Sequence, residues 1–220
     1  MYHILRRSLS TLTSLPCGAC GAPVVSSADP LCSACWGALY LAAEPKAIQL
    51  SFAFEGVSWV PYGSTEVKRI MGAIKFRGHH ELAVMLGSAM AAALPPPEVD
   101  ALVPIPLAAS RAYRRGYNQA ERIAHGMHLR WGIPVVTDLL HRPEWFASKQ
   151  SSRNEAERAL IYGAYDAPLS AQWVGARVAV IDDTFTTGSS LNAAAEVLIK
   201  KARVAEVVPL TLAYTSRRAT

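Results

Sequence analysis

The sequence has 220 residues, of which 51% are apolar, and this is enough for one well-buried core with a small accessory module. The composition excludes a disordered chain, and the longest apolar helical run, residues 82–94, is too short and too rich in alanine to cross a membrane. The net charge of +5 and the pI of about 9.1 favour an anionic partner such as phosphate, pyrophosphate or nucleic acid.

The first 16 residues combine Arg6 and Arg7 with several leucines, a composition that also occurs in export signals. Serine and threonine interrupt the apolar run, however, and no small-residue cleavage site follows. We therefore predict a short amphipathic helix, with Ile4, Leu5, Leu9 and Leu12 on one side, and a cytoplasmic location.

All four cysteines lie in a first unit that we expect to span residues 1–43. They form two C-x2-C pairs separated by eleven residues: Cys17, Cys20, Cys32 and Cys35. Each pair can occupy one edge of a tetrahedron, which favours a structural Zn²⁺ site with no open position for a substrate. Two alternatives stay open, an iron–sulfur centre and a pair of disulfides, although disulfides are disfavoured in a reducing compartment.

The remaining residues, 44–220, alternate between helical and strand patterns and indicate one larger domain. Residues 44–60 are predicted as a connector that leads into an extended strand. We expect helices over residues 64–76, 79–94, 117–132 and 191–202, and strands over residues 99–107, 133–140, 176–182 and 206–215. Nearly continuous apolar strands between amphipathic helices predict an α/β fold, a parallel sheet covered on both faces with ligands at the carboxyl ends of its strands.

The segment 142–160 fits this alternation poorly because it is polar, charged and rich in serine. A long polar excursion between two regular elements is typical of a lid or binding loop. We therefore predict a mobile loop over these residues.

The stretch "VAVIDDTFTTGSS", residues 178–190, carries the strongest functional pattern. Two acids, Asp182 and Asp183, follow a buried strand, and a turn with hydroxyl groups and Gly188 then enters a helix. Backbone N–H groups at a helix start cradle a phosphate, while paired carboxylates accept a sugar diol or bind Mg²⁺. A phosphorylated ribose satisfies both halves. The alternative is a plain strand end followed by a helix cap at Ser189 and Ser190.

This stretch resembles the phosphoribosyl pyrophosphate (PRPP) motif of type I phosphoribosyltransferases, and the chain as a whole resembles their ComF-type (GntX-like) branch, associated with DNA uptake and natural competence in bacteria. Three further segments agree: "YGSTEVKRIMGAIKFRG" with Lys75, "VPIPLAASRAYRRGYNQAERIA", and "HRPEWFASKQ" followed by Arg158. The cysteine pairs are similar to the N-terminal zinc ribbon of that branch. Ile161 departs from the pattern, because the branch usually has asparagine there. The resemblance implies the type I phosphoribosyltransferase fold.

The resemblance also implies a role for each matching residue. Asp182 and Asp183 would hold the ribose hydroxyls, and the 5′-phosphate would bind the residues that follow: Thr184, Phe185, Thr186, Thr187, Gly188, Ser189 and Ser190. Pyrophosphate, together with Mg²⁺, would face five basic side chains: Lys75, Arg111, Arg114, Arg115 and Arg158. Arg115 would stabilise the departing pyrophosphate and act with Asp182 and Asp183 as the catalytic set.

Three positions in the matching segments also have simpler interpretations. Lys75 fits a solvated helix end as well as a phosphate contact. Asn118 and Gln119 fit the cap of the helix that begins there as well as a ligand contact.

Three functions are consistent with the sequence. The chain is an enzyme that transfers phosphoribose to a nitrogenous acceptor, a PRPP sensor without turnover, or a DNA-uptake factor. The third would bind single-stranded DNA and use the zinc module to contact competence proteins such as an uptake helicase or a DNA-processing protein. Aromatic and basic residues do not alternate as in a stacking groove, which weakens direct DNA binding. No pattern identifies the acceptor or the oligomeric state.

Overall fold

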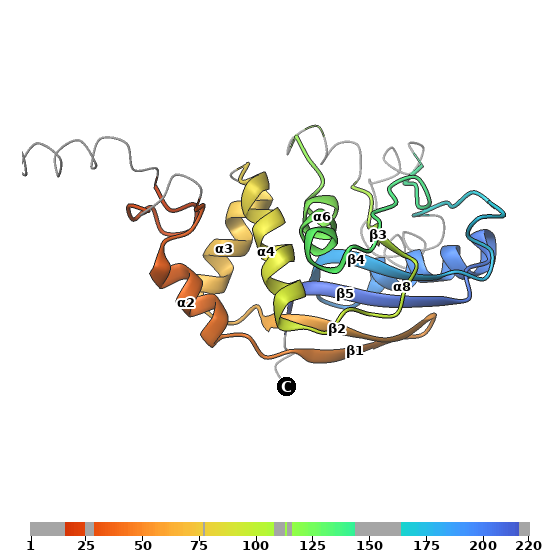
Figure 1. Cartoon of the computed structure of the whole chain (residues 1–220), viewed down its shortest axis with the longest axis horizontal. Helices are drawn as coiled ribbons and strands as arrows, with labels where there is room; N and C mark the ends of the chain where they lie inside the picture. Colours follow the sequence, from red (N-terminus) through yellow and green to blue (C-terminus); the bar gives the residue numbers. More distant parts are fainter. Residues whose placement is uncertain are drawn as a thin grey trace, which may run out of the picture.

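The computed structural model describes residues 16–24, 29–76, 78–107, 113, 116–143 and 164–215. Its centre is a five-stranded sheet in the order β1-β2-β5-β4-β3 (Figure 1). The strands are β1 (Lys46–Leu50), β2 (Ala53–Pro61), β3 (Ala101–Pro104), β4 (Arg177–Phe185) and β5 (Glu206–Tyr214). The order places β4, which carries the acid pair, between two other strands and away from the sheet edges.

Four of the five strands run parallel, since β2 pairs with β5, β5 with β4 and β4 with β3 in parallel registers. The edge strand β1 is antiparallel to β2 and forms a hairpin with it. The predicted α/β class is therefore confirmed, with a mixed sheet in place of a purely parallel one. The predicted connector over residues 44–60 was wrong in this respect, because it contains β1 and most of β2.

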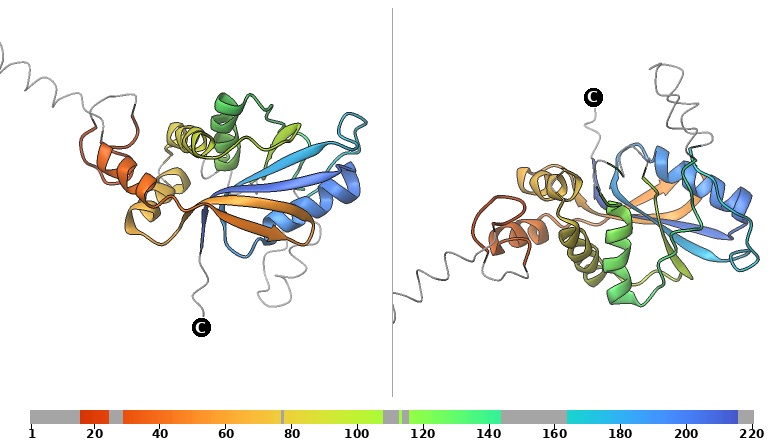
Figure 2. Two further views of the ribbon diagram at one scale, coloured as in Figure 1. Left: turned by 60° about the horizontal axis from the view of Figure 1, so that its bottom comes forward. Right: turned by 90° about the horizontal axis from the view of Figure 1, so that it is seen from above.

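Helices cover both faces of the sheet (Figure 2). The helices are α2 (Ser33–Leu41), α3 (Thr65–Phe76), α4 (His80–Ala93), α6 (Gln119–Trp131) and α8 (Ser189–Val197), which continues as a π-helical turn, Leu198–Ala202. Side chains alternate along β4: Ala179 and Ile181 pack in the same apolar cluster as α3, α4 and α6, whereas Val178 and Val180 pack with α8. Each face of β4 is thus buried, as the apolar sequence of this strand predicts.

The close contact between α4 and α6 depends on two glycines. A Cβ atom on Gly87 would lie 2.1 Å from the carbonyl oxygen of Ile123, and one on Gly126 would lie 1.9 Å from that of Val84. No side chain fits at either position, so the two backbones touch directly. This contact seats α6 against the sheet and thereby fixes where its first residue, Gln119, lies.

Two predicted elements differ from the structure. Residues 133–140 form no strand: Val135 makes one isolated bridge to Leu102, with Pro134 accepting a hydrogen bond from the N–H of Leu102 at 2.8 Å. Proline offers no N–H to extend this pairing. Strand β4 is longer than predicted and continues through Asp182 and Asp183 to Phe185.

Two other predictions lie outside the described residues. These are the amphipathic helix of the first residues and most of the predicted loop 142–160, because residues 1–15 and 144–163 are not described. Both flanks of the second gap are described: His141 and Asp166 exchange backbone hydrogen bonds of 2.7 and 2.9 Å. Within the part of the chain that the structure describes, no helix has the length and apolar character that a membrane span requires.

Candidate functional site

The four cysteines converge on one point, as their spacing predicts. The Sγ atoms of Cys17, Cys20, Cys32 and Cys35 all lie within 4.8 Å of one another, and those of Cys20 and Cys32 are 3.7 Å apart. Zinc–sulfur bonds of about 2.3 Å in a tetrahedron place the sulfurs about 3.8 Å apart. All four are free thiols, so the disulfide alternative is not realised. The arrangement fits a structural metal ion such as zinc.

The surroundings of the cluster prepare one thiol for metal binding. Burial opposes ionisation of Cys17, but backbone N–H groups of Cys20, Cys32 and Ala19 stabilise its thiolate, and the pKa falls to about 6. Burial raises the pKa of Cys35, and its hydrogen bonds with the other thiols raise it further. A metal ion must therefore displace the proton of Cys35, whereas Cys17 already favours the thiolate that metals bind.

Short backbone contacts hold this module together. The N–H of Cys17 donates to Ala22 at 2.7 Å, and the N–H of Gly18 donates to Pro30 at 2.8 Å. Helix α2 then begins directly after Cys32 and carries Cys35 in its first turn. Because Leu31 and Leu39 are each only 1% exposed and belong to the apolar cluster of α3 and α4, the module is built into the core.

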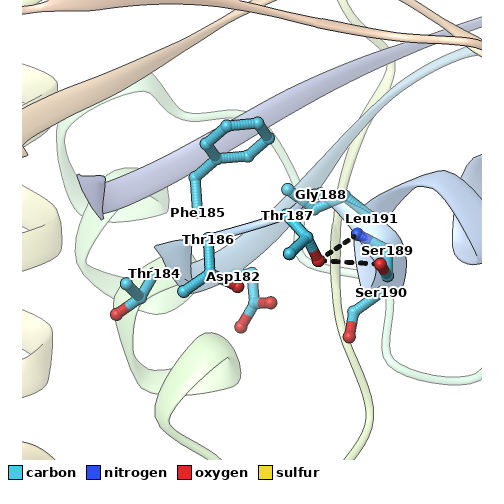
Figure 3. Close-up of a pocket in the computed structure, with 9 residues that line it drawn as sticks. All are labelled: Asp182, Thr184, Phe185, Thr186, Thr187, Gly188, Ser189, Ser190 and Leu191. Carbon is cyan, nitrogen blue, oxygen red and sulfur yellow. Dashed lines mark hydrogen bonds between the residues drawn. The ribbon is translucent and has the colours of Figure 1, made fainter. Parts of the chain in front are cut away.

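The second candidate site lies where β4 passes into α8. Figure 3 shows the residues that line a pocket there. The space between them, part of it open to solvent, is about 260 Å³. Its lining consists of Asp182, Thr184, Phe185, Thr186, Thr187, Gly188, Ser189, Ser190 and Leu191. The N-terminal backbone of α8 supplies partial positive charge to the pocket, and hydroxyl groups add hydrogen-bonding capacity. The structure thus brings the predicted phosphate loop and Asp182 together in one space.

Internal hydrogen bonds shape the loop. The hydroxyl groups of Thr187 and Ser189 are 2.7 Å apart, and the N–H of Ser189 lies 3.4 Å from Thr187 Oγ1 (Figure 3). Gly188 has a φ of +76°, which favours glycine, and a Cβ atom there would lie 2.6 Å from Leu50 Cδ2. The conformation of the loop therefore favours glycine, and a larger residue there would also displace the Leu50 side chain of the β1 hairpin.

The two aspartates have different surroundings, although they are neighbours in the sequence. Asp182 lines the pocket beside α8, and its Oδ1 accepts a hydrogen bond from the N–H of Asp183 at 2.7 Å. Asp183 forms an ion pair with Lys75 of α3, with Nζ and Oδ1 2.8 Å apart. Side chains of a strand alternate between its two faces, and β4 includes both residues. The extended strand thus directs one acid toward α8 and the other toward α3.

Lys75 makes contacts that sequence reasoning did not predict. Besides its ion pair with Asp183, its Nζ donates a hydrogen bond of 2.8 Å to Thr184 Oγ1 and lies 5.8 Å from the centre of the Tyr62 ring. The predicted helix end is correct, since α3 ends at Phe76. The prediction that Lys75 is solvated is wrong, because its side chain is only 17% exposed. The hydroxyl of Tyr117, another residue that sequence reasoning missed, donates to the carbonyl of Ile74 and anchors this helix end.

The capping interpretation of Asn118 is confirmed. Its side chain accepts a hydrogen bond from the N–H of Ala120 at 3.1 Å at the start of α6, and its Nδ2 donates to the carbonyl of Ile105 at 3.0 Å. Gln119 is 1% exposed. Asn118 thereby links α6 to the chain that leaves β3. The four predicted arginine contacts lie outside the described residues: Arg111, Arg114, Arg115 and Arg158.

The donor chemistry of the acid pair fits Mg²⁺, which prefers carboxylate oxygens and retains several of its waters. Asp182 presents its carboxylate in the pocket, but Lys75 already contacts one oxygen of Asp183. Asp182 would hold the ion directly, and Asp183 would contribute once Lys75 moved. When bound, Mg²⁺ would neutralise part of the charge on a polyphosphate.

Two curated relatives match part of the chain, and no family model matches it. The competence protein ComFC of Bacillus subtilis is 31% identical over 149 residues, which cover 66% of this chain and 59% of that protein. Competence protein F of Haemophilus influenzae is 30% identical over 109 residues, 49% of this chain and 47% of that protein. The chain thus spans about half the length of the curated relatives it matches.

Solved structures that are similar to this chain include an amidotransferase and a phosphoribosyltransferase. A glutamine PRPP amidotransferase from B. subtilis, complexed with ADP and GMP, has a TM-score of 0.45 and 20% identity over 60% of this chain and 26% of its own. The adenine phosphoribosyltransferase of Saccharomyces cerevisiae has a TM-score of 0.38 and 16% identity over 83% of this chain and 89% of its own. The relationship of this chain to known proteins rests on the two curated relatives. Over the matched part of its length, the chain is homologous to competence proteins of the ComF type.

Proposed function

We propose that this chain binds PRPP with Mg²⁺ at the junction of β4 and α8 and transfers its phosphoribosyl group to a nitrogenous acceptor. The observation that supports this most directly is the shared pocket. Asp182, the hydroxyl-bearing loop and the start of α8 line one space beyond the carboxyl end of a parallel strand. An anion cradle next to a carboxylate suits a molecule that carries both a phosphate and a diol.

Each part of the site takes one part of the ligand in this proposal. The 5′-phosphate binds the N–H groups and hydroxyls of Thr187 to Ser190, and Asp182 accepts hydrogen bonds from the ribose. The pyrophosphate extends toward Lys75 and the proposed contacts Arg111, Arg114, Arg115 and Arg158. Cationic groups there stabilise the charge that develops on the departing pyrophosphate, which is the main electrostatic demand of the reaction.

The reaction is a substitution at the anomeric carbon of the ribose. The bond from this carbon to the pyrophosphate oxygen breaks, and both electrons leave with pyrophosphate. The lone pair of an acceptor nitrogen forms the new bond, and the proton of that nitrogen passes to solvent or to a base. A sensor that binds PRPP without this step uses the same contacts, so turnover has to be measured separately from binding.

We further propose that the protein acts in competence, the process in the names of both curated relatives. DNA uptake, binding of single-stranded DNA and contacts with other competence proteins belong to this proposal. The four free thiols favour a reducing compartment, so we place this activity in the cytoplasm.

Calorimetric titration with PRPP and Mg²⁺ tests the binding site. We expect saturable binding by the wild type and a loss of about 100-fold or more in affinity for Asp182→Asn/Asp183→Asn, because Asp182 would accept hydrogen bonds from the ribose and both carboxylates would hold Mg²⁺. The variant Asp138→Asn/Glu55→Gln removes the same charge from two exposed positions and should bind normally. Unchanged affinity in the first variant would refute the assignment of the site.

Pyrophosphate release with a panel of nitrogenous bases then separates the enzyme from the sensor. Release that requires both an acceptor and the two aspartates supports transfer. If PRPP does not bind while single-stranded DNA binds with a steep salt dependence, the chain is a nucleic-acid-binding protein and the PRPP proposal fails.

A further inference from the structure

The contacts of Lys75 point to a second role for this residue, beyond that of a pyrophosphate contact. Its Nζ lies 2.8 Å from both Asp183 Oδ1 and Thr184 Oγ1. Within the described residues, this is the ion pair in which both partners are most enclosed, with 17% of Lys75 and 15% of Asp183 exposed. Little solvent screens this interaction, so the charge of the ammonium is felt strongly at the carboxylate.

Such a pair excludes a second cation from the same oxygen. A Mg²⁺ ion coordinates carboxylate oxygens at about 2.1 Å and would lie within a few ångströms of the ammonium group. Two cations at that distance repel each other in a poorly screened site. A divalent cation therefore gains Asp183 only when Lys75 finds another anionic partner.

Pyrophosphate is a partner of that kind. It carries several negative charges, and a lysine ammonium contacts phosphate oxygens as a mobile point charge on a flexible stem. In the proposed ligand, this group extends toward the side of β4 from which Lys75 approaches. Transfer of Lys75 from Asp183 to the ligand would free one carboxylate oxygen as the anion arrives.

We propose that Lys75 is the resident counter-ion of Asp183 and keeps divalent cations off this carboxylate until a pyrophosphate-bearing ligand draws the ammonium away. Metal and ligand then bind together, and metal alone binds weakly. The inference rests on the proposed function for the identity of the ligand, but the exclusion of the cation is a property of the chain itself. Lys75 is in this respect a positioning residue.

Binding of Mn²⁺ alone, followed by the electron paramagnetic resonance signal of the free ion, tests the exclusion. Lys75→Met should bind Mn²⁺ about tenfold more tightly than the wild type, because it removes a positive charge next to the carboxylate. Lys75→Arg keeps the charge and should behave like the wild type. Lys68→Met removes one charge from an exposed position of the same helix and should leave Mn²⁺ affinity unchanged.

Two further measurements identify the oxygen and the ligand. Adding Asp183→Asn to Lys75→Met should abolish the gain in Mn²⁺ affinity. Inorganic pyrophosphate should raise the Mn²⁺ affinity of the wild type more than that of Lys75→Met, after subtraction of the Mn²⁺ that pyrophosphate binds in solution. Equal Mn²⁺ affinities of the wild type and Lys75→Met would overturn the inference. If the proposed function itself fails, a different experiment shows it: the calorimetric titration of the wild type with PRPP gives no binding.

Discussion

The two candidate sites are built in opposite ways. The cysteine cluster takes all its ligands from residues 17–35, and backbone hydrogen bonds within that segment fix their positions. The pocket at β4 takes its phosphate loop from one stretch, but Lys75 reaches Thr184 across 109 residues of sequence. Local spacing determines the first site, whereas the topology of the sheet determines the second.

The two sites also differ in how they relate to the core. Cys17 and Cys35 are 3% and 6% exposed and pack in the same apolar cluster as α3 and α4. The proposed phosphate loop lies at the carboxyl end of the inner strand β4, and Thr186 and Thr187 are exposed. Changes in the cysteine cluster should therefore lower stability alone, whereas changes in the loop should also lower ligand binding.

Cys20→Ser tests the first half of this contrast and should have the largest effect. Cys20 is exposed, so packing alone predicts almost no loss of stability. If the four thiols hold a metal ion, the same substitution removes one of four ligands and should lower the free energy of unfolding by about 3 kcal/mol or more. Calorimetric unfolding of the zinc-loaded protein, with metal content measured in parallel, gives this value.

Removal of the metal provides the control. After treatment with a strong chelator, the wild type should lose several degrees of melting temperature, and its difference from Cys20→Ser should shrink to about 0.5 kcal/mol or less. If Cys20→Ser did not change the free energy of unfolding in protein prepared with zinc, the cluster would hold no metal ion.

Gly188→Ala tests the second half. The added Cβ atom would lie 2.6 Å from Leu50 Cδ2 and 2.9 Å from Phe185 Cε2, at a φ of +76°. We expect a loss of about 2 kcal/mol in the free energy of unfolding, from backbone strain and the displaced neighbours together. The affinity for PRPP should fall by about tenfold or more, because the N–H groups of the loop move. Denaturant unfolding and calorimetric titration measure the two effects.

Gly175→Ala is the matched control for the backbone term. Gly175 has a φ of +79°, but a Cβ atom there would meet nothing within 4 Å. The free energy of unfolding of this variant should fall by about 1 kcal/mol, and its affinity for PRPP should equal that of the wild type. If both glycine variants lost the same stability and neither lost affinity, the contact between the β1 hairpin and the loop would have no functional part.

The sequence predicts those features that depend on local chemistry. The C-x2-C spacing leads to the cysteine cluster, the apolar run of residues 178–181 leads to a buried strand, and the hydroxyl–glycine turn leads to the pocket where β4 passes into α8. In each case, neighbouring residues determine the geometry. The cap at Asn118 follows the same rule.

The features that sequence reasoning missed depend on tertiary contacts. Nothing near Lys75 in the sequence indicates an ion pair with Asp183, because the packing of α3 against the sheet brings the two together only in the folded chain. The β1 hairpin was also missed, since Lys46–Leu50 is short and is ordered by pairing with β2. A helix end rich in charge and a short polar edge strand carry weak sequence signals, because their surroundings decide their conformation.

The smallest predicted effect concerns a contact outside both candidate sites. It shows how much stability an ordinary surface ion pair contributes, against which the variants of the two sites can be compared. A hydrogen bond from Lys201, at 2.7 Å, holds the pKa of Asp166 below its ordinary value, and the N–H of Ala167 adds to this effect. A lowered pKa in the folded state stabilises the protein above the ordinary aspartate value of about 4, and this contribution is lost as the pH falls from that value through the lowered pKa. Because both side chains are more than half exposed, Asp166→Asn should cost only about 0.5 kcal/mol at pH 7. Denaturant unfolding at pH 7 and pH 3 should show this difference in the free energy of unfolding at the first pH and a smaller one at the second. A larger loss that persists at pH 3 would mean that Asp166 acts through its backbone pairing with His141, at the base of the segment 144–163, and not through its charge.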